Sequence, residues 1–358
     1  MLTFHPLAVA ARTDVADDAI ALTLAVPPAL RDAFRFRAGQ HVAIRREIGG
    51  QEERRTYSIV NPEGDDALKI GIRVQKGGRM SEDLARRVRP GDVLDVLTPN
   101  GSFHAEAGAA GPRSLVAFAS GSGITPVLSI AATALAAHPG NRVQLWYGNT
   151  DRGRAMFLEE VMALKDRHLD RFSVAFVMSR EPQEVDWLNG RIDAAKLEAF
   201  TKAGLDLSAV DEFFVCGPGT MGDELPAALA ALGARGRIHV ERFAPAAAAP
   251  RPAETRAAAV AAKAPGESEI TVVMDGRRRR FAMATGGDVI LDAAQAAGID
   301  LPFSCRAGVC STCRARLVSG TAEMETNMAL EEWEVEAGYI LCCQARPTSA
   351  ALEISYDE

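Results

Sequence analysis

The sequence predicts a multidomain protein: an antiparallel β-barrel, then a doubly wound α/β domain with a parallel sheet, then a small α+β domain. Three observations predict this order. Short strand patterns separated by turn residues fill residues 2 to about 105, and strands alternate with helical patterns from Ser114 onward. Near the C-terminus, three cysteines follow the spacing C-x4-C-x2-C. A chain of 358 residues is long enough for two or three such domains.

Composition and charge exclude several classes of protein. The apolar content of 47% and charged content of 24% are those of an ordinary globular protein, and a net charge of -7 argues against a nucleic-acid binder with a basic patch. From Glu269 to Glu358 there are 14 Asp or Glu and 8 Lys or Arg, so nearly all the negative excess lies there. This acidic surface could dock on a basic partner, or it could simply keep the protein in solution.

The cellular location is predicted from what the sequence lacks. The N-terminus has no basic region followed by an apolar core, which a signal peptide would need. The longest mostly apolar stretch, Ile124 to Ala137, is too short to span a bilayer. Six cysteines do not resemble a secreted disulfide framework. We therefore expect a cytoplasmic protein that binds neither membrane nor nucleic acid.

The first domain should be an antiparallel barrel of short strands. Turns are expected at Pro27-Pro28, Asn61-Pro62, Pro90-Gly91 and Pro99-Asn100-Gly101. Between them the predicted strand segments are 19–26, 36–44, 56–60, 68–74 and 93–97. Many short strands joined by such turns are typical of a closed barrel.

Within the barrel, the segment R-R-T-Y-S-I from Arg54 can bind a cofactor. In a strand, Arg55 and Tyr57 point to one face, and Thr56 and Ser58 to the other. An arginine can bridge a diphosphate, a tyrosine can stack on an aromatic ring system, and a serine can hydrogen-bond a ring nitrogen. The alternative is an amphipathic strand with a surface arginine pair.

A second candidate contact follows in the segment from Arg73-Val74 to the G-G-R-M-S-E-D-L motif. Here glycines, among them Gly78, and then Met80 and Ser81 precede a helical pattern. A glycine-rich turn that opens a helix presents backbone N–H groups to an anion such as a pyrophosphate. The alternative is an ordinary helix with Ser81 as its N-cap, and the two interpretations are compatible.

The second domain carries its own phosphate-binding turn. Strand and helix patterns alternate over 115–119, 125–137, 143–147, 157–165, 173–178, 194–199 and 212–216, which predicts a parallel sheet with helices on both faces. The motif S-G-S-G-I-T-P, with Gly121, Gly123, Thr125 and Pro126, follows the first strand and opens the first helix. It departs from G-x-G-x-x-G, but it lies where a pyrophosphate turn belongs.

Two later strand ends extend this site. Ser179 and Arg180 pair a hydroxyl with a guanidinium, which suits a phosphate monoester, and Arg152 and Arg154 could serve the same phosphate. The alternative for these residues is a solvated loop. Farther on, C-G-P-G-T-M places Cys216 at a strand end, followed by Gly217, Pro218 and Met221. A lone cysteine there would usually be part of the core.

The C-terminal cysteines have the spacing of a plant-type 2Fe-2S site. Cys305, Cys310 and Cys313 are followed thirty residues on by Cys343. Gly308 suits a loop that must wrap closely around the cluster. Zinc would usually require a second C-x2-C pair or histidines, and no histidine lies between Cys305 and Cys343. A zinc site and a disulfide framework are the alternatives. Arg306, Ser311 and Thr312 are candidates for tuning the reduction potential of the cluster.

Taken together, these motifs resemble the ferredoxin–NADP reductase superfamily followed by a plant-type ferredoxin of the β-grasp fold. The resemblance implies that the R-x-Y-S and G-G-R-M-S motifs bind FAD and that G-x-G-x-T-P binds a nicotinamide cofactor. It implies that Ser179-Arg180 reads the 2'-phosphate of NADPH and that Cys216, beside the nicotinamide, orients hydride transfer together with Ser58. It also places Glu241 and Phe243 near the flavin.

The domain order narrows the resemblance to reductase components of bacterial multicomponent oxygenases. The segments that carry it are F-H-P-L, A-G-Q-H, R-R-T-Y-S-I, D-W-L-N-G-R-I-D and N-x-A-L-E-x-x-E-V. It implies electron flow from NADPH to FAD to the 2Fe-2S cluster and then to a separate di-iron oxygenase component. Cys342 departs from relatives, which usually have Ser or Thr there. It could be confused with the fourth ligand, although the Cys-Gln pair favours Cys343.

The expected domains are a FAD-binding barrel at 1–107, an NAD(P)-binding domain at 108–243, an Ala- and Pro-rich linker at 244–267 and a 2Fe-2S domain at 268–358. The linker composition is typical of a semi-rigid tether. Three other functions remain open at this point. The chain could serve a Rieske dioxygenase or a hydroxylase, it could be a stand-alone flavoprotein reductase, or it could be a non-enzymatic redox or zinc protein.

Overall fold

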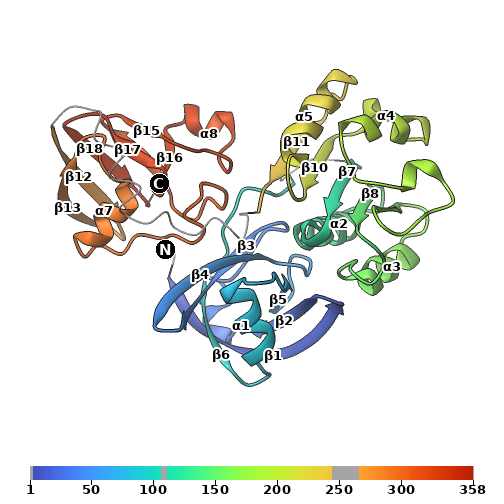
Figure 1. Ribbon diagram of the computed structural model, residues 1–358, viewed down its shortest axis with the longest axis horizontal. Coiled ribbons are helices and arrows are strands. Elements are labelled where there is room, and N and C mark those ends of the chain that lie inside the picture. Colours follow the sequence, from blue (N-terminus) through green and yellow to red (C-terminus); the bar gives the residue numbers. More distant parts are fainter. Residues whose placement is uncertain (1–2, 106–110, 244–265, 358) are drawn as a thin grey trace. The chain divides into compact units, whose positions relative to one another are not determined.

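The computed structural model describes residues 3–105, 111–243 and 266–357 (Figure 1). They belong to two compact units. One comprises Phe4–Glu53 and Tyr57–Arg242, and the other comprises Phe243–Glu358 together with Met1–Thr3 and Arg54–Thr56. Each is described by itself. The predicted linker lies almost wholly outside the described residues, and so does the expected boundary near residue 107; these two expectations stay predictions.

The first unit begins with a six-stranded antiparallel sheet in the order β4-β3-β6-β1-β2-β5. An isolated antiparallel bridge between Ile59, just after β4, and Ile70 in β5 joins the two edges, which closes the sheet into the predicted barrel. Leu22, Ile44 and Ile72 fill its interior. The bounds are β1 Phe4–Ala16, β2 Ala19–Ala25, β3 His41–Ile48, β4 Gln51–Ser58, β5 Ala67–Arg73, α1 Arg79–Arg87 and β6 Val93–Leu97.

In the barrel, one strand was missed and two assignments were wrong. The long strand β1 was not predicted, because its polar residues obscure the alternation of apolar positions. The segment 36–40 is a turn and not part of a strand. Gly39 has φ +96°, and a Cβ there would lie 1.8 Å from Phe103 O. The helix α1 begins at Arg79 with Gly78 as its N-cap, so Ser81 lies inside the first turn and is not the cap.

The same unit continues into a five-stranded parallel sheet in the order β11-β10-β7-β8-β9. Helices α2 and α3 cover one face and α4 and α5 the other, so helices lie on both faces as predicted, although α5 itself was not among the predicted segments. Asp193 ends the D-W-L-N-G-R-I-D loop and caps α4 by accepting a hydrogen bond from Lys196 N. The bounds are β7 Ser114–Ser120, α2 Ile124–Ala137, β8 Arg142–Asn149, α3 Leu158–Arg167, β9 Phe172–Met178, α4 Ala194–Lys202, β10 Glu212–Cys216, α5 Met221–Ala231 and β11 Arg237–Glu241.

The barrel and the parallel sheet share a core. Gly71 in β5 lies so close to the start of α2 that a Cβ there would be 2.5 Å from Thr125 Cγ2. Lys69 Nζ in β5 is 2.8 Å from Glu160 Oε1 in α3, and Ser129 Oγ donates to Asn61 O at 2.7 Å. These contacts fix the ends of β4 and β5 relative to the turn before α2.

The second unit is a mixed five-stranded sheet in the order β13-β12-β18-β14-β16, with α7 packed on it. Asp275 and Gly276, with φ of 57° and 68°, form the turn between β12 and β13. Two of the exposed arginines of β13 pair with acidic neighbours, Arg278 with Glu353 and Arg280 with Glu269. The bounds are β12 Glu267–Met274, β13 Arg277–Ala284, α7 Ile290–Ala296, β14 Arg314–Ser319, β15 Ala322–Met324, α8 Glu332–Glu336, β16 Tyr339–Leu341, β17 Ala345–Pro347 and β18 Ala351–Ser355.

Candidate functional site

The carboxylate of Glu241 brings the two predicted catalytic residues together. Its Oε2 atom is 3.5 Å from Ser58 Oγ and 3.9 Å from Cys216 Sγ. Ser58 ends β4, whereas Cys216 and Glu241 are register partners at the ends of β10 and β11. Burial, and then the Glu241 carboxylate, raise the pKa of the Cys216 thiol. Cys216 therefore stays protonated, in agreement with an orienting role and not a nucleophilic one.

A glycine turn separates β7 from α2, next to this cluster. A Cβ on Gly123 would lie 2.0 Å from Cys216 O, and one on Gly217 would lie 3.0 Å from Ser120 Cβ. The ends of β7 and β10 are therefore in direct backbone contact. They are also where the strand order of the sheet reverses, which is the position where doubly wound sheets bind dinucleotides.

The rest of the predicted nicotinamide motif supports this turn. Thr125 Oγ1 donates to Ser122 O at 2.8 Å, and Pro126 is buried in the first turn of α2. The Tyr147 hydroxyl donates a hydrogen bond of 3.2 Å to Gly121 O, which fixes the backbone of the turn to β8. Met221 is buried against Gly217, and Pro218 is exposed beside them. Gly123 and Gly217 are thus packed directly against the end of β10 and Met221, and the turn lies at the position where a doubly wound sheet binds a dinucleotide.

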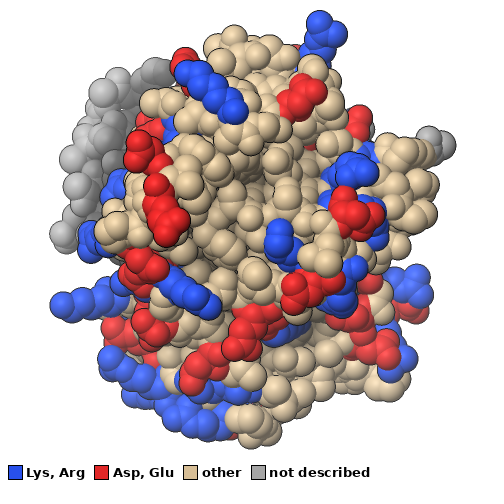
Figure 2. Space-filling view, turned by 90° about the vertical axis from the view of Figure 1, so that its right-hand side faces the viewer, with Lys and Arg blue, Asp and Glu red and all other residues tan. Residues whose placement is uncertain are grey.

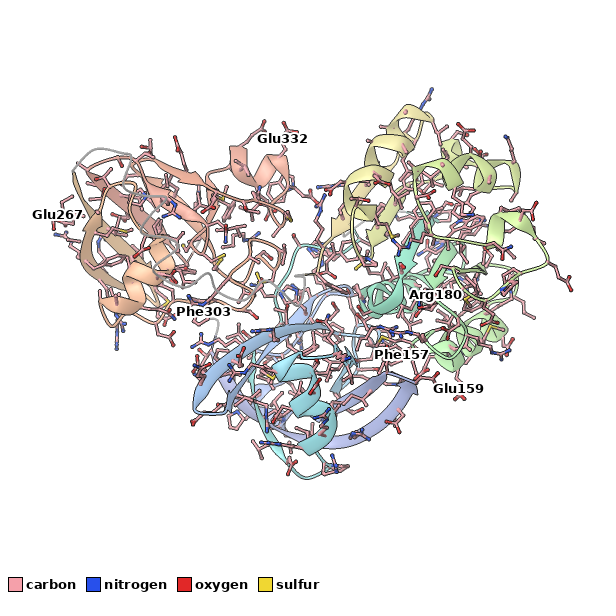
Figure 3. The ribbon with its side chains drawn as sticks, in the orientation of Figure 1. Phe157, Glu159, Arg180, Glu267, Phe303 and Glu332 are labelled. Atoms are coloured by element: carbon pink, nitrogen blue, oxygen red, sulfur yellow. The ribbon has the colours of Figure 1, made fainter. Side chains whose placement is uncertain are left out.

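The second nicotinamide element lies at the neighbouring strand ends. Ser179 N donates to Asn149 O at 2.9 Å and Arg180 N to Thr150 O at 2.8 Å, so β8 and β9 hold this loop. Both side chains are exposed, and Figure 3 labels Arg180 among the side chains of the α/β domain. Arg152 is exposed nearby, whereas Arg154 is paired with Asp18 at 2.5 Å. Arg152 and Arg180 are thus the better placed of the candidate phosphate contacts.

On the barrel side, the predicted flavin residues fall into two groups. In β4, Arg55 is exposed, Thr56 and Tyr57 are half-buried and Ser58 is buried. In the turn before α1, Ser81 Oγ accepts from Gln75 N at 3.1 Å and donates to Gly78 O at 3.2 Å, and Met80 is buried. Ser81 therefore shapes the turn that presents the first amides of α1.

Two predicted flavin residues have structural partners. Arg73 forms an ion pair with Asp18, and its Nη2 donates to Arg154 O at 2.8 Å, so it links the barrel to the α/β domain. Val74 N donates to Asp18 O at 2.8 Å, which fixes the start of the glycine turn. Phe243 is exposed at the end of the described segment.

One buried residue of this site was missed in the sequence. His41, the first residue of β3, is 5% exposed, and its Nδ1 lies 3.8 Å from Glu241 Oε1. The A-G-Q-H segment was noted only as a point of resemblance. No local pattern could reveal that its histidine meets a carboxylate 200 residues farther along the chain.

The four predicted cluster ligands converge from two loops. Cys305, Cys310 and Cys313 lie between α7 and β14, and Cys343 lies in the turn between β16 and β17. Hydrogen bonds from the thiols of Cys310 and Cys343 lower the pKa of Cys305, and the thiol of Cys343 also contacts that of Cys313. All four sulfur atoms therefore belong to one connected group.

The donor set fits a two-iron cluster better than a single ion. Among the described residues no three His, Cys, Asp or Glu side chains are placed to hold one metal ion. A two-iron cluster does not need three side chains around one position, because its four thiolates bind two different irons. The loop also wraps tightly: Arg306, Gly308 and Ser311 all have φ between 48° and 74°, and a Cβ on Gly308 would lie 2.8 Å from Thr326 O.

Polar contacts of the cysteine sulfurs identify which neighbours can tune the reduction potential of a cluster. Ala307 N donates to Cys305 Sγ at 3.3 Å, Thr312 Oγ1 lies 3.3 Å from Cys310 Sγ, and Gln344 Nε2 lies 3.7 Å from Cys343 Sγ. Arg306, also a predicted tuner, instead directs its guanidinium to Asp292 and Gln295. Its role is to hold the loop against α7.

None of the helices in the described part of the chain combines the length and the apolar character that a membrane span requires.

Comparisons with known proteins identify three domain families along the chain. Family models match an oxidoreductase FAD-binding domain at residues 6–105, an oxidoreductase NAD-binding domain at 118–225 and a 2Fe-2S iron–sulfur cluster binding domain at 272–348. The chain is 37% identical to one of the subunits of 1,2-phenylacetyl-CoA epoxidase from Escherichia coli K12, over 100% of this chain and 99% of that protein.

Other relatives serve different oxygenases. The chain is 33% identical to the ferredoxin reductase component of 3-ketosteroid-9-alpha-monooxygenase of Rhodococcus rhodochrous, over 98% of this chain and 96% of that one. Among solved structures, phthalate dioxygenase reductase matches with a TM-score of 0.59 and 23% identity over 98% of both chains. That match shows the shared three-domain fold.

Proposed function

This chain belongs to the family of FAD- and NAD-binding oxidoreductases with a C-terminal 2Fe-2S domain that includes the reductase components of oxygenases, and we propose that it reduces a di-iron epoxidase acting on phenylacetyl-CoA. As a member it is an NAD(P)H-dependent oxidoreductase that uses FAD and a 2Fe-2S cluster, with an oxygenase as its partner. The proposal adds NADPH as the donor and the identity of the acceptor.

One observation carries the proposal: a single chain holds a site for hydride chemistry and a four-thiolate site for single electrons. Bound FAD accepts a hydride and releases its electrons one at a time, and the cluster carries one electron. The residues of the chain do the positioning. Ser58 and Cys216 meet at Glu241 next to the predicted nicotinamide turn, where they would orient the two rings.

The identity of the acceptor is supported by the full-length match to the epoxidase component. The charge of the cluster domain supports an acceptor whose docking surface is basic. From Leu317 to Ala345 there are six glutamates and no Lys, Arg or His. By contrast, Figure 2 shows Lys and Arg interspersed with Asp and Glu over the face that it presents. An acidic segment beside the cluster suits an acceptor with a basic docking surface.

The test is reconstitution. The purified chain, NADPH and a phenylacetyl-CoA epoxidase oxygenase component should convert phenylacetyl-CoA to its ring epoxide, which mass spectrometry detects. The 3-ketosteroid monooxygenase oxygenase with its own substrate is the comparison, because that relative is nearly as similar. Faster turnover in the steroid system would overturn the acceptor assignment and would leave the reductase chemistry intact.

A further inference from the structure

We propose that the buried hydroxyl of Tyr147 fixes the spacing between two parts of the nicotinamide site and thereby contributes to the preference for NADPH over NADH. The inference rests on the proposed function, which takes NADPH as the donor. The first part is the turn before α2, which includes Gly121. The second part is the loop at residues 150–156, which follows β8 and includes Arg152, together with Arg180 after β9.

Tyr147 lies between these two parts. Its side chain is fully buried near the end of β8, and its hydroxyl lies 3.2 Å from Gly121 O and 3.1 Å from Met156 O. Burial raises the pKa of this phenol, so the hydroxyl keeps its proton. A phenol has one proton to donate, and two carbonyl oxygens at nearly equal distances share it in a three-centre hydrogen bond. One hydroxyl therefore joins the turn before α2 to the end of the 150–156 loop.

The bond to Gly121 affects the donors of the turn. The carbonyl of Gly121 and the N–H of Ser122 form one peptide group. Hydrogen bonds in a chain polarise one another, so donation from Tyr147 to Gly121 O makes the Ser122 N–H a stronger donor to a pyrophosphate. This effect does not involve a 2'-phosphate, so it should be the same for NADP+ and NAD+.

The bond to Met156 ties the hydroxyl to a rigid part of the backbone. The next residue, Phe157, is labelled in Figure 3 and has φ +56°, a left-handed conformation that is strained for a bulky side chain. Phe157 N donates to Val15 O at 3.1 Å, and a Cβ on Gly71 would lie 2.7 Å from the Phe157 ring. The barrel thus holds Phe157 in its strained conformation. Met156 O is therefore a fixed acceptor, and Tyr147 joins the turn to it.

Backbone hydrogen bonds connect the 150–156 loop to the predicted phosphate contacts. Arg180 N donates to Thr150 O at 2.8 Å, and Arg152 N donates to Glu181 Oε2 at 2.7 Å. Within the loop, Ala155 N donates to Arg152 O at 3.1 Å. The backbone positions of both arginines therefore depend on the loop whose end the Tyr147 hydroxyl contacts.

A fixed spacing favours a ligand that spans both parts. NADP+ has a pyrophosphate for the turn and a 2'-phosphate for the arginines, whereas NAD+ lacks the 2'-phosphate. A preorganised site binds a spanning ligand more tightly, because less ordering remains to be done on binding. Without the hydroxyl, both nucleotides lose the polarised turn, but only NADP+ also loses the fixed spacing. Because Tyr147 is fully buried, it is a positioning residue and not a phosphate contact.

The test uses Tyr147→Phe, which removes the hydroxyl and keeps the ring. NADP+ and NAD+ are titrated into the holoenzyme, and the flavin difference spectrum gives the Kd of each. We expect the Kd of NAD+ to rise about 2- to 10-fold, the effect of one net hydrogen bond. The ratio of the Kd of NAD+ to that of NADP+ should fall about fivefold, the lower end of typical coupling between sites.

Two further sets of variants complete the test. Tyr147→Met also lacks the hydroxyl and has a flexible side chain that can fill the space, so it decides the question if Tyr147→Phe does not fold. In an Arg180→Gln background, Tyr147→Phe should weaken both nucleotides equally, because the 2'-phosphate contact is already lost. Tyr339→Phe, which removes a hydroxyl from the cluster domain, is the matched control and should leave both Kd values unchanged.

A ratio that stays within about twofold of the wild-type value in the Tyr147 variants would overturn the inference, because independent sites agree to that extent. A wild-type protein that binds NADP+ no more tightly than NAD+ would instead refute NADPH as the donor in the proposed function. The two failures are therefore distinguishable.

Discussion

Cys342 and Cys343 are neighbours in the sequence, but their thiols have different surroundings. Cys343 contacts Cys305 and Cys313 from the turn after β16. Cys342 is fully buried in the core of the second unit, where its thiol contacts the Tyr356 hydroxyl, and burial raises its pKa. A protonated thiol in an apolar core is a poor metal ligand.

This difference predicts opposite results for two matched substitutions. Cys343→Ser should abolish the 2Fe-2S absorption and the electron paramagnetic resonance signal of the reduced protein, because a thiolate ligand is lost. Cys342→Ser should retain about two irons per chain, as expected for an intact cluster. Iron analysis and spectroscopy of the two proteins, purified in parallel, give the answer. Loss of the cluster in Cys342→Ser alone would reverse the assignment.

Arg180 leads to a prediction about cofactor choice. Its exposed guanidinium follows the end of β9, next to Ser179, at the edge of the sheet that carries the predicted nicotinamide turn. A hydrogen bond to a charged phosphate is worth about 1.5–3 kcal/mol. Arg180→Gln should therefore lower kcat/KM for NADPH roughly 10- to 100-fold and leave the value for NADH almost unchanged.

Steady-state reduction of ferricyanide measures both constants without the oxygenase. Arg191→Gln is the matched control, because Arg191 is another exposed arginine in the loop that follows. An equal loss with NADH and NADPH would mean that Arg180 does not read the 2'-phosphate.

At the scale of elements, the turn before α2 depends on two glycines for different reasons. Gly121 has φ +56°, but the nearest atom to an added Cβ is 3.9 Å away, so alanine there would bring backbone strain and no clash. Gly123 has φ -61°, which any residue can adopt, but a Cβ would lie 2.0 Å from Cys216 O. Gly121 is needed for its left-handed backbone conformation, and Gly123 is needed for the close approach of the turn to the backbone of Cys216.

Alanine substitutions should separate the two roles. Gly121→Ala should destabilise the protein by about 1–2 kcal/mol, the strain of one left-handed residue. Gly123→Ala should push β7 and β10 apart, destabilise by roughly 1–3 kcal/mol, as is typical of overpacking, and weaken NADPH binding more than Gly121→Ala does. Urea unfolding and NADP+ titration measure these effects. Equal effects of the two substitutions on binding would contradict the distinction.

The elements that could be predicted were those with strong local patterns. The strands and helices of the α/β domain from β7 to β10 follow from their alternation, whereas α5 and β11 were not among the predicted segments. The strand β1 could not be predicted, because pairing with β2 and β6 overrides its weak local pattern. In the site, each motif could be located in the sequence, but the meeting of Ser58, Cys216 and His41 at Glu241 depends on tertiary packing.

At the scale of the whole molecule, the cluster domain has the features of an electron-delivery surface. Met328, Trp333 and Val335 are 47%, 50% and 41% exposed, within the segment that has glutamates and no basic residue. Met328 N donates to Gly308 O at 3.0 Å, so this segment adjoins the cluster loop directly. Electron transfer requires close approach, and exposed apolar side chains with an acidic rim suit a partner with an apolar centre and a basic rim.

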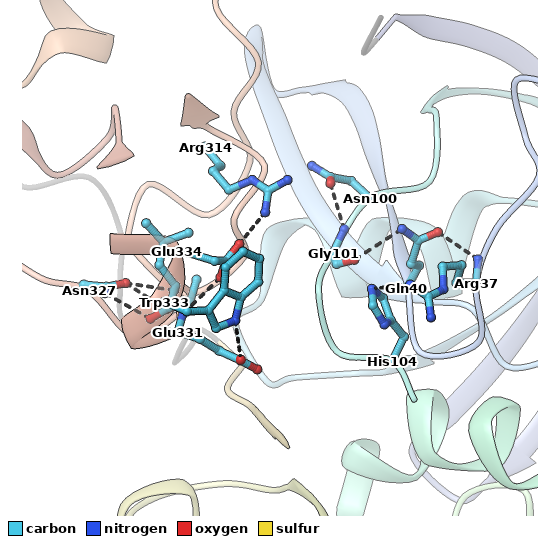
Figure 4. Close-up of polar contacts among 12 residues, drawn as sticks. Arg37, Gln40, Asn100, Gly101, His104, Arg314, Asn327, Glu331, Trp333 and Glu334 are labelled. Carbon is cyan, nitrogen blue, oxygen red and sulfur yellow. Dashed lines mark hydrogen bonds and ion pairs between the residues drawn. The ribbon is translucent and has the colours of Figure 1, made fainter. Parts of the chain in front are cut away.

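The anchoring of α8 makes this surface rigid. Glu334 is fully buried, pairs with Arg314, the residue after Cys313, and completes a capping box with Glu331 (Figure 4). The Trp333 indole Nε1 donates to Glu331 Oε2 at 2.7 Å, which fixes the exposed ring. The position of the indole relative to the cluster loop is therefore set within the domain.

We expect Trp333→Ala to lower kcat/KM for the oxygenase component about 10- to 30-fold, since an aromatic anchor of an interface contributes around 2 kcal/mol. Ferricyanide reduction should not change, because that small acceptor needs no docking surface. Leu169→Ala, at an apolar residue in the other unit that is 72% exposed, is the matched control.

The glutamates of this segment should affect the rate at which the two proteins associate. In wild type we expect the rate of oxygenase reduction to fall as salt is added. In the double variant Glu332→Gln and Glu336→Gln this fall should be smaller, because the association then depends less on charge. If the salt dependence and the response to Trp333→Ala both match those of the control, the acceptor docks elsewhere on the chain.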